Sequence, residues 1–63
     1  MPKYPDIEVE IDDGNAFLII GRVRKAMKKH KLSEKEINKF TDEAEASDYD
    51  NLLQTCMEWV ELT

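Results

Sequence analysis

The stretch DGNAFLIIGRVRKAMKKHK, residues 13–31, has the spacing of one amphipathic helix and holds most of the positive charge of the chain. At about 100° per residue, an apolar arc of roughly 120° forms on one side of this helix. The arc contains Ala16, Ile19, Ile20, Val23, Ala26, Met27 and His30. The opposite side, called the basic face below, contains Arg22, Arg24, Lys25, Lys28, Lys29 and Lys31. The pattern predicts a helix over residues 15–31 with its apolar arc against a core.

Three residues near the start of this helix break the two-sided pattern. Phe17, Leu18 and Gly21 fall on the side of the basic residues. We therefore expect the first turns to be buried on all sides and only the later turns to be half exposed.

Length and composition indicate a single small domain over residues 1–63. Charged residues make up 37% of the chain and hydrophobic residues 41%, which is enough apolar material for a core. The net charge is -5, yet six of the nine Lys and Arg residues lie on the basic face. We expect a protein that is acidic overall and basic in one place.

The one cysteine, Cys56, excludes an intrachain disulfide and a cysteine-rich metal site. The sequence shows no signal peptide and no apolar run of about 18 residues, the length that a membrane-spanning helix needs. These features predict a cytoplasmic protein without a membrane partner.

Residues 6–12 alternate between apolar and acidic side chains, which predicts a half-buried strand. Residues 1–5 contain two prolines and are expected to form an extended lead-in. A lone strand needs a pairing partner for its backbone. Two partners stay open: residues 60–63 of the same chain, or the same strand of a second subunit in a homodimer.

Capping signals place two further helices, over residues 34–46 and 48–60. Ser33 followed by Glu36 has the spacing of a capping box, in which the side chain of each residue accepts a hydrogen bond from the backbone N–H of the other. Leu32 and Ile37 have the spacing of the hydrophobic staple that accompanies such a box.

The other helix starts have capping residues as well. Asp13 or Asn15 is expected to cap the first helix, and Ser47 or Asp48 the third. The predicted fold class is therefore α+β, one short N-terminal strand followed by three helices, with residues 60–63 as the candidate second strand.

The third helix has a wide apolar face, an arc of about 160°. It contains Tyr49, Leu52, Leu53, Cys56, Met57, Trp59 and Val60, and the opposite side contains Asp50, Asn51, Gln54, Thr55 and Glu58. So wide a face predicts contact with more than one neighbour. Either all of it packs in the core, or part of it is exposed as a partner or dimer surface.

The acidic residues around Gly14 do not form a calcium-binding loop. An EF-hand needs oxygen ligands before its glycine and a Glu at its last position. Aligning Gly14 with that glycine places Val9, Ile11 and Ile20 at ligand positions. We interpret the acids of the strand as protection of an exposed edge against aggregation.

His30 and Cys56 are the remaining candidates for chemistry. His30 is expected to be half buried and to stabilise the carbonyl end of the first helix. Cys56 is expected to be an unreactive core residue. One His and one Cys on different helices supply neither a catalytic pair nor a metal-ligand set. We expect no catalytic residue, no cofactor, no metal site and no enzymatic activity.

The basic face is the candidate partner-binding site, with Arg22, Arg24, Lys25, Lys28, Lys29 and Lys31 as its residues. Three interpretations stay open: a solvated surface paired with carboxylates of the same chain, a surface for nucleic-acid phosphates, or a surface for an acidic protein. The net charge of -5 opposes a polyanion. We predict a non-enzymatic interaction or regulatory protein, with a nucleic-acid-binding accessory protein as the alternative. The acidic strand and residues 42–50 could likewise meet a basic partner.

Four short motifs identify a resemblance that covers most of the chain. They are DGNAF at residues 13–17, GRVRKA at 21–26, DYD with LL at 48–53 and WV at 59–60. The sequence resembles a group of short, uncharacterised bacterial and phage proteins. The resemblance implies a bacterial or phage setting, helix caps, core positions and a glycine, Gly21, for tight helix packing; it implies no site residue.

Overall fold

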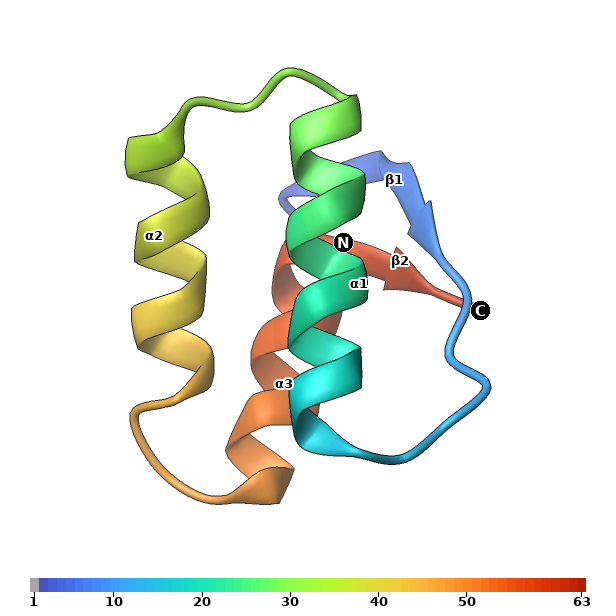
Figure 1. The fold of residues 1–63 in the computed structure, drawn as a ribbon, viewed down its shortest axis with the longest axis vertical. Helices are drawn as coiled ribbons and strands as arrows, with labels where there is room; N and C mark the ends of the chain where they lie inside the picture. The colour runs from blue at the N-terminus through green and yellow to red at the C-terminus, as the bar shows by residue number, and fades with distance from the viewer. Residues whose placement is uncertain (1) are drawn as a thin grey trace.

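The structure is a computed structural model that describes residues 2–63. Its elements are β1 (Tyr4–Val9), α1 (Ala16–Lys29), α2 (Glu34–Ala44), α3 (Tyr49–Trp59) and β2 (Val60–Leu62). The two strands form a parallel sheet beside α1 and α3, and α2 packs on the far side of these helices (Figure 1). The predicted α+β fold is confirmed.

The pairing of β1 with β2 occurs within one chain. Glu8 lies opposite Glu61, and Val9 lies opposite Leu62. Beyond the strands, the Thr63 N–H donates to the Val9 carbonyl oxygen at 2.9 Å. Two partners were predicted for the first strand, and the structure shows the one within the same chain, the C-terminal residues. The pairing of β1 therefore does not require a second subunit.

Tyr4 and Pro5, predicted as part of the lead-in, belong to β1, and Pro2 and Lys3 precede it. β1 begins at Tyr4 and ends at Val9, so the predicted bounds of 6–12 were too late at both ends. Lys3 N–H donates to the Glu58 carbonyl oxygen at 2.7 Å, which anchors this segment to α3. Residue 1 of the predicted lead-in lies outside the described residues.

Lys3 and Tyr4 form a cluster with Trp59. The rings of Tyr4 and Trp59 stack with centroids 6.0 Å apart, and Lys3 Nζ lies 4.4 Å from the Trp59 ring centroid. The Tyr4 hydroxyl donates to the Glu36 carboxylate at 2.6 Å, and Lys3 Nζ lies 3.3 Å from the same oxygen. The start of β1 is thereby joined to both α2 and the end of α3.

Glu36 serves this cluster rather than a capping box. Ser33 caps α2 as predicted, because its Oγ accepts the Glu36 N–H at 3.2 Å. The Glu36 carboxylate, however, binds Tyr4 and Lys3. The hydrogen bonds from Tyr4 and Lys3 lower the pKa of Glu36 below its usual 4.5. The bond to Glu36 raises the pKa of Tyr4 above 10.0.

The other predicted caps are present. Asn15 Oδ1 accepts the N–H groups of Phe17 and Leu18 at the start of α1, and Asp13 Oδ1 accepts the Asn15 N–H at 2.8 Å. Asp48 Oδ1 accepts the Asn51 N–H at 3.0 Å at the start of α3. These local hydrogen bonds satisfy N–H groups that a helix leaves without partners.

The junction between α1 and α2 is a Schellman motif with an unusual residue in its left-handed position. Leu32 N–H donates to the Met27 carbonyl oxygen at 3.0 Å, and Lys31 N–H donates to that of Lys28 at 2.9 Å. Lys31 has φ 64°, a conformation in which glycine is usual. Leu32 packs against the core and brings the chain to Ser33.

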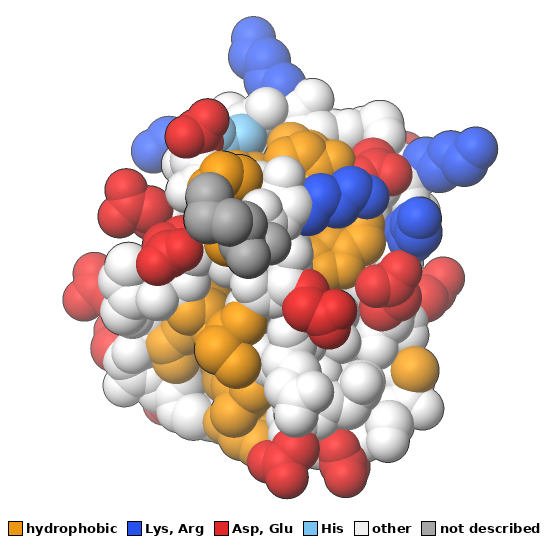
Figure 2. Space-filling view, turned by 180° about the vertical axis from the view of Figure 1, so that it is seen from behind, with side chains coloured by type: hydrophobic (Ala, Val, Ile, Leu, Met, Phe, Trp, Pro, Cys, Tyr) orange, Lys and Arg blue, Asp and Glu red, His pale blue; other side chains and the backbone are white. Residues whose placement is uncertain are grey.

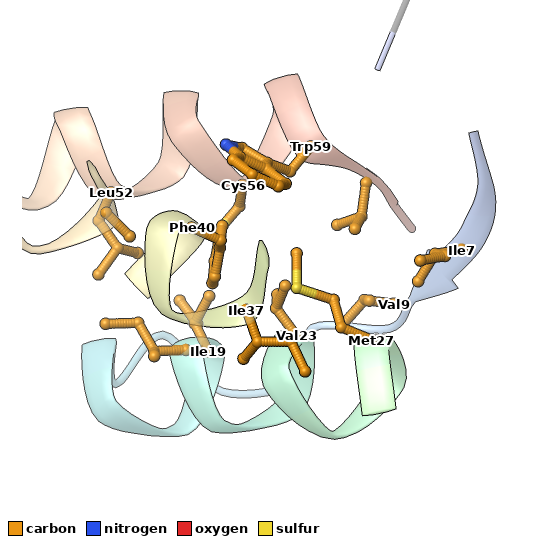
Figure 3. Packing of buried hydrophobic residues seen from close by; sticks show 13 residues of the cluster. Ile7, Val9, Ile19, Val23, Met27, Ile37, Phe40, Leu52, Cys56 and Trp59 are labelled. Atoms are coloured by element: carbon orange, nitrogen blue, oxygen red, sulfur yellow. The ribbon is translucent and has the colours of Figure 1, made fainter. Parts of the chain in front are cut away.

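The core lies between the three helices and extends to the inner face of β1. Phe40 of α2 is fully buried, with side chains of α1 on one side and Cys56 and Trp59 of α3 on the other (Figure 3). The Phe40 and Trp59 rings meet edge to face with centroids 5.8 Å apart. Trp59 Nε1 donates to the Glu43 carboxylate at 3.1 Å, so its polar edge is satisfied.

The start of α1 is more exposed than predicted. Ile19, Ile20, Val23 and Met27 are buried, but Phe17 is 83% exposed and Leu18 49% exposed. A Cβ added to Gly21 would have no neighbour within 4 Å among the described residues, so Gly21 packs against no helix. Both predictions were wrong because the neighbours of α1 cover only its apolar arc and leave the opposite side open.

The buried face of α3 is rotated from the predicted one. Thr55, expected on the polar side, is 6% exposed, whereas Tyr49 and Met57 are 43% and 53% exposed. α3 contacts α2, α1 and β2, as its wide apolar face predicted. α2 covers the flank that carries Thr55 and Trp59, which leaves the opposite margin of the apolar face in solvent.

Replacing Lys31 by glycine should stabilise the protein. Glycine adopts the left-handed conformation without the steric penalty of a Cβ, so we expect Lys31→Gly to raise the free energy of unfolding by about 1 kcal/mol. Thermal unfolding followed by circular dichroism should show a Tm about 4–8 °C higher. Lys25→Gly, inside α1, is the matched control and should lose about 1 kcal/mol. A loss of stability in both variants would contradict the left-handed geometry of Lys31.

Removing the Glu36 carboxylate should change how stability depends on pH. Because the pKa of Glu36 is lowered on folding, its ionised form stabilises the fold above pH 4.5, and this contribution is lost as pH falls through the lowered pKa. Glu36→Gln should be less stable than the wild type at neutral pH, and the difference should shrink in strong acid.

Urea unfolding followed by Trp59 fluorescence at about pH 7 and about pH 2 measures this difference. The control is Glu61→Gln, which removes an exposed carboxylate without a bound side chain within residues 2–63. Because Glu61 lies opposite Glu8, removing its charge should not lower stability at neutral pH, in contrast to Glu36→Gln. An equal loss at both pH values for Glu36→Gln would show that the Glu36 charge does not stabilise the cluster.

Candidate functional site

The two arginines of the basic face are bound within the protein. Arg22 forms an ion pair with Asp12 at 3.0 Å and also reaches the Glu10 carbonyl oxygen at 3.5 Å. Arg24 Nη1 donates to Thr41 Oγ1 of α2 at 2.6 Å. Thr41 in turn donates to the Ile37 carbonyl oxygen at 2.8 Å. Arg24 therefore joins α1 to α2 and is only partly available to a partner.

The four lysines of the basic face have no such partner. Lys25, Lys28, Lys29 and Lys31 are exposed. Within residues 2–63 the structure contains two ion pairs, Lys3 with Glu36 and Arg22 with Asp12, and neither includes these lysines. Of the residues of the basic face, only Arg22 is therefore paired with a carboxylate of the same chain, as the first interpretation requires. The remaining positive charge faces solvent.

A groove of about 500 Å³ runs between the basic face and β1. Arg22, Lys25 and Lys29 line its α1 side, and Glu8 and Glu10 line its β1 side. The backbone of β1 is also accessible from this groove. The Val9 carbonyl oxygen and the Ile11 N–H form hydrogen bonds with Thr63. The backbone groups of the alternate residues, Glu8 and Glu10, therefore point to the opposite edge of the strand. At that edge Arg22 donates to the Glu10 carbonyl oxygen. The groove thus has one basic and one acidic wall.

Charge is separated along the chain and in space. Residues 22–39 contain eight of the nine Lys and Arg residues but two of the fourteen Asp and Glu residues, whereas residues 40–63 contain seven acids and no Lys or Arg. In Figure 2 the basic side chains gather in the upper half of the molecule, and the lowest charged side chains are acidic. An acidic partner therefore meets a local charge opposite to the overall one.

His30 and Cys56 have different environments and do not form a pair. His30 is the C-cap residue of α1, as its place near the carbonyl end predicted, but it is exposed rather than half buried because it lies beyond the last contact of α1 with the core. Cys56 is fully buried between α2 and α3. Desolvation raises the pKa of its thiol to about 11.

The described side chains contain no group of three His, Cys, Asp or Glu residues placed to hold a metal ion. No described helix has both the length and the apolar character needed to cross a bilayer. Comparison of the chain with protein-family models, curated proteins and solved structures gave no match.

The burial of Cys56 predicts a protected thiol. Because the side chain is inaccessible and its thiolate is disfavoured, the native protein should not react with Ellman's reagent at about pH 8 on the timescale on which the guanidinium-unfolded chain reacts fully. In a Cys56→Ala background, Met57→Cys places a thiol one residue away at an exposed position and should react at once. Rapid reaction of native Cys56 would contradict its burial.

Proposed function

We propose that this protein is a non-enzymatic interaction or regulatory protein that binds an acidic protein partner through the basic face. The observation that carries the proposal is a set of four exposed lysines, Lys25, Lys28 and Lys29 on α1 and Lys31 just after it, none of them in an ion pair within residues 2–63. A carboxylate-rich surface would supply the missing counter-charges. We place the protein in the cytoplasm of a bacterium or phage-infected cell, in line with its sequence motifs.

The acidic wall of the groove favours a protein over a nucleic acid. A phosphate backbone that followed Arg22, Lys25 and Lys29 would lie next to the carboxylates of Glu8 and Glu10, which repel it. A protein surface can place acids against the lysines and a basic or neutral residue against Glu8 and Glu10. Complementarity of this kind gives specificity and a fast association rate.

The rigid support of α1 also favours recognition by a preformed surface. Arg24 holds α1 to α2 through Thr41, and Arg22 holds it to the loop that follows β1 through Asp12. The lysines follow these anchors along the second half of α1 and the turn after it, so they project from a segment that is tied to its neighbours. Little conformational entropy of the backbone is lost when a partner binds such a face.

Affinity capture with matched baits tests the proposal. The wild-type protein and a Lys25→Glu/Lys29→Glu variant are used to capture proteins from a lysate of the source organism, with and without nuclease treatment. We expect a partner that binds the wild type, survives nuclease and is lost with the variant, because two charges of the face are reversed. A Lys35→Glu/Lys39→Glu variant changes the same charges on α2 and should retain the partner.

Two results would count against the proposal. Capture that is identical for the wild type and the Lys25→Glu/Lys29→Glu variant would show that the basic face is not used. Capture that disappears after nuclease treatment, together with a gel shift whose affinity falls steeply with added salt, would instead assign the face to nucleic acid.

A further inference from the structure

An apolar strip crosses the surface from the start of α1 along α3. Tyr49, Leu53 and Met57 are spaced four residues apart, so they lie in one line along α3. Tyr49 and Met57 are 43% and 53% exposed, and Leu53 is partly buried. Phe17 of α1, which is 83% exposed, lines the same hollow as Tyr49. We call these four residues the α3 strip.

The hollow at one end of the strip has an apolar floor. Its volume is about 340 Å³, and it lies where the start of α1, the end of α2 and the start of α3 meet. Ala16, Ile20, Ala44 and Leu52 contribute apolar side chains to it. The Tyr49 hydroxyl donates to the Gly14 carbonyl oxygen, which holds the ring at its edge. A large apolar side chain from another molecule would find both a ring and a recess here.

The α3 strip is left outside the core by the way that α3 packs. The buried face of α3 is centred on Leu52, Cys56 and Trp59 and extends to Thr55, so the strip lies along the opposite margin. No other element of residues 2–63 covers Phe17 or Met57, the two most exposed members. Large apolar residues in a continuous exposed line are typical of a protein-binding surface.

The surroundings of the strip are acidic. Asp50 is exposed on α3 three residues before Leu53, Glu58 lines a second hollow together with Met57, and Glu45 and Asp48 line the first hollow. Residues 40–63 contain no Lys or Arg, and the side chain of Lys3, whose backbone N–H donates to the Glu58 carbonyl oxygen, is paired with Glu36. Figure 2, which views the molecule from the side of α3, shows a band of hydrophobic side chains down its lower half with acidic side chains at the lower end. The strip is therefore an apolar line with a negative border.

We propose that the α3 strip binds a cationic amphipathic helix of a partner protein. A helix with apolar residues every three or four positions matches the spacing of Tyr49, Leu53 and Met57, and Lys or Arg residues beside that line would meet Asp50 and Glu58. A second copy of this chain docked strip to strip would bring the same carboxylates together, which disfavours that occupant. This surface has the opposite charge to the basic face and is independent of it.

The test is a titration of the ¹⁵N-labelled chain of residues 1–63 with a synthetic peptide of about 18 residues of leucine and lysine, designed with its leucines on one helical side. We expect saturable chemical-shift changes confined to the amides near Phe17 and along residues 49–57. Met57→Gln keeps the helix propensity but removes the apolar end of the strip, and it should weaken binding at least fivefold. Leu18→Gln changes an exposed apolar residue outside the hollow and should bind as the wild type does.

A second pair of measurements separates this site from the basic face. The Lys25→Glu/Lys29→Glu variant should bind the leucine–lysine peptide as tightly as the wild type, although it loses the acidic partner. A peptide with glutamate in place of lysine should not bind the α3 strip, because the acidic border repels it.

Several outcomes would overturn the proposal. Shift changes on another face, equal binding of the Met57→Gln variant, or equal binding of the glutamate peptide would each show that the strip does not select a cationic helix. A dimer of the free protein that Met57→Gln dissociates, measured by light scattering, would show that a second copy occupies the strip instead. Unchanged circular dichroism of the free variant confirms that it is folded.

Discussion

The parallel pairing of β1 with β2 determines the arrangement of the whole chain. Parallel strands cannot be joined by a tight hairpin, so the segment between them must cross over the sheet, and here that segment contains α1, α2 and α3. Trp59 is the last residue of α3 and directly precedes β2. Its stacking on Tyr4 brings the first residues of β1 to the end of α3, and its edge contact with Phe40 ties both to α2. The two ends of a short sequence thereby share one core with its middle.

Features that depend on nearby residues could be predicted from the sequence. Asn15, Ser33 and Asp48 cap helices because each needs only the backbone N–H groups two or three residues ahead. The α+β order and the burial of Cys56 followed from periodicity. The basic face could be predicted in the same way, because a helix fixes the relative directions of its own side chains.

Features that depend on distant residues could not be predicted. The choice of Tyr4 and Lys3 as partners of Glu36 joins residues more than thirty positions apart, and a capping box was the local alternative. The exposure of Phe17 and the burial of Thr55 depend on which sides of α1 and α3 their neighbours cover, which no spacing within either helix reveals. The same limit applies to the site. Only the folded chain shows that Arg24 is bound to Thr41, whereas the lysines of the basic face are exposed to solvent. Met57 could be recognised as a surface residue only once the buried face of α3 was known.

The separation of charge between residues 22–39 and the rest of the chain makes the molecule an electric dipole. A net charge of -5 alone would repel an acidic partner at long range, but a dipole turns in the field of that partner before contact. The field of an acidic partner would favour approach to the basic face, and that of a cationic partner would favour approach to the acidic side. Beyond about 10 Å, the screening length at 0.1 M salt, exposed charges are largely screened, so this orienting effect acts only during the last part of the approach. One small domain can in this way offer different sides to partners of opposite sign without any change in its shape.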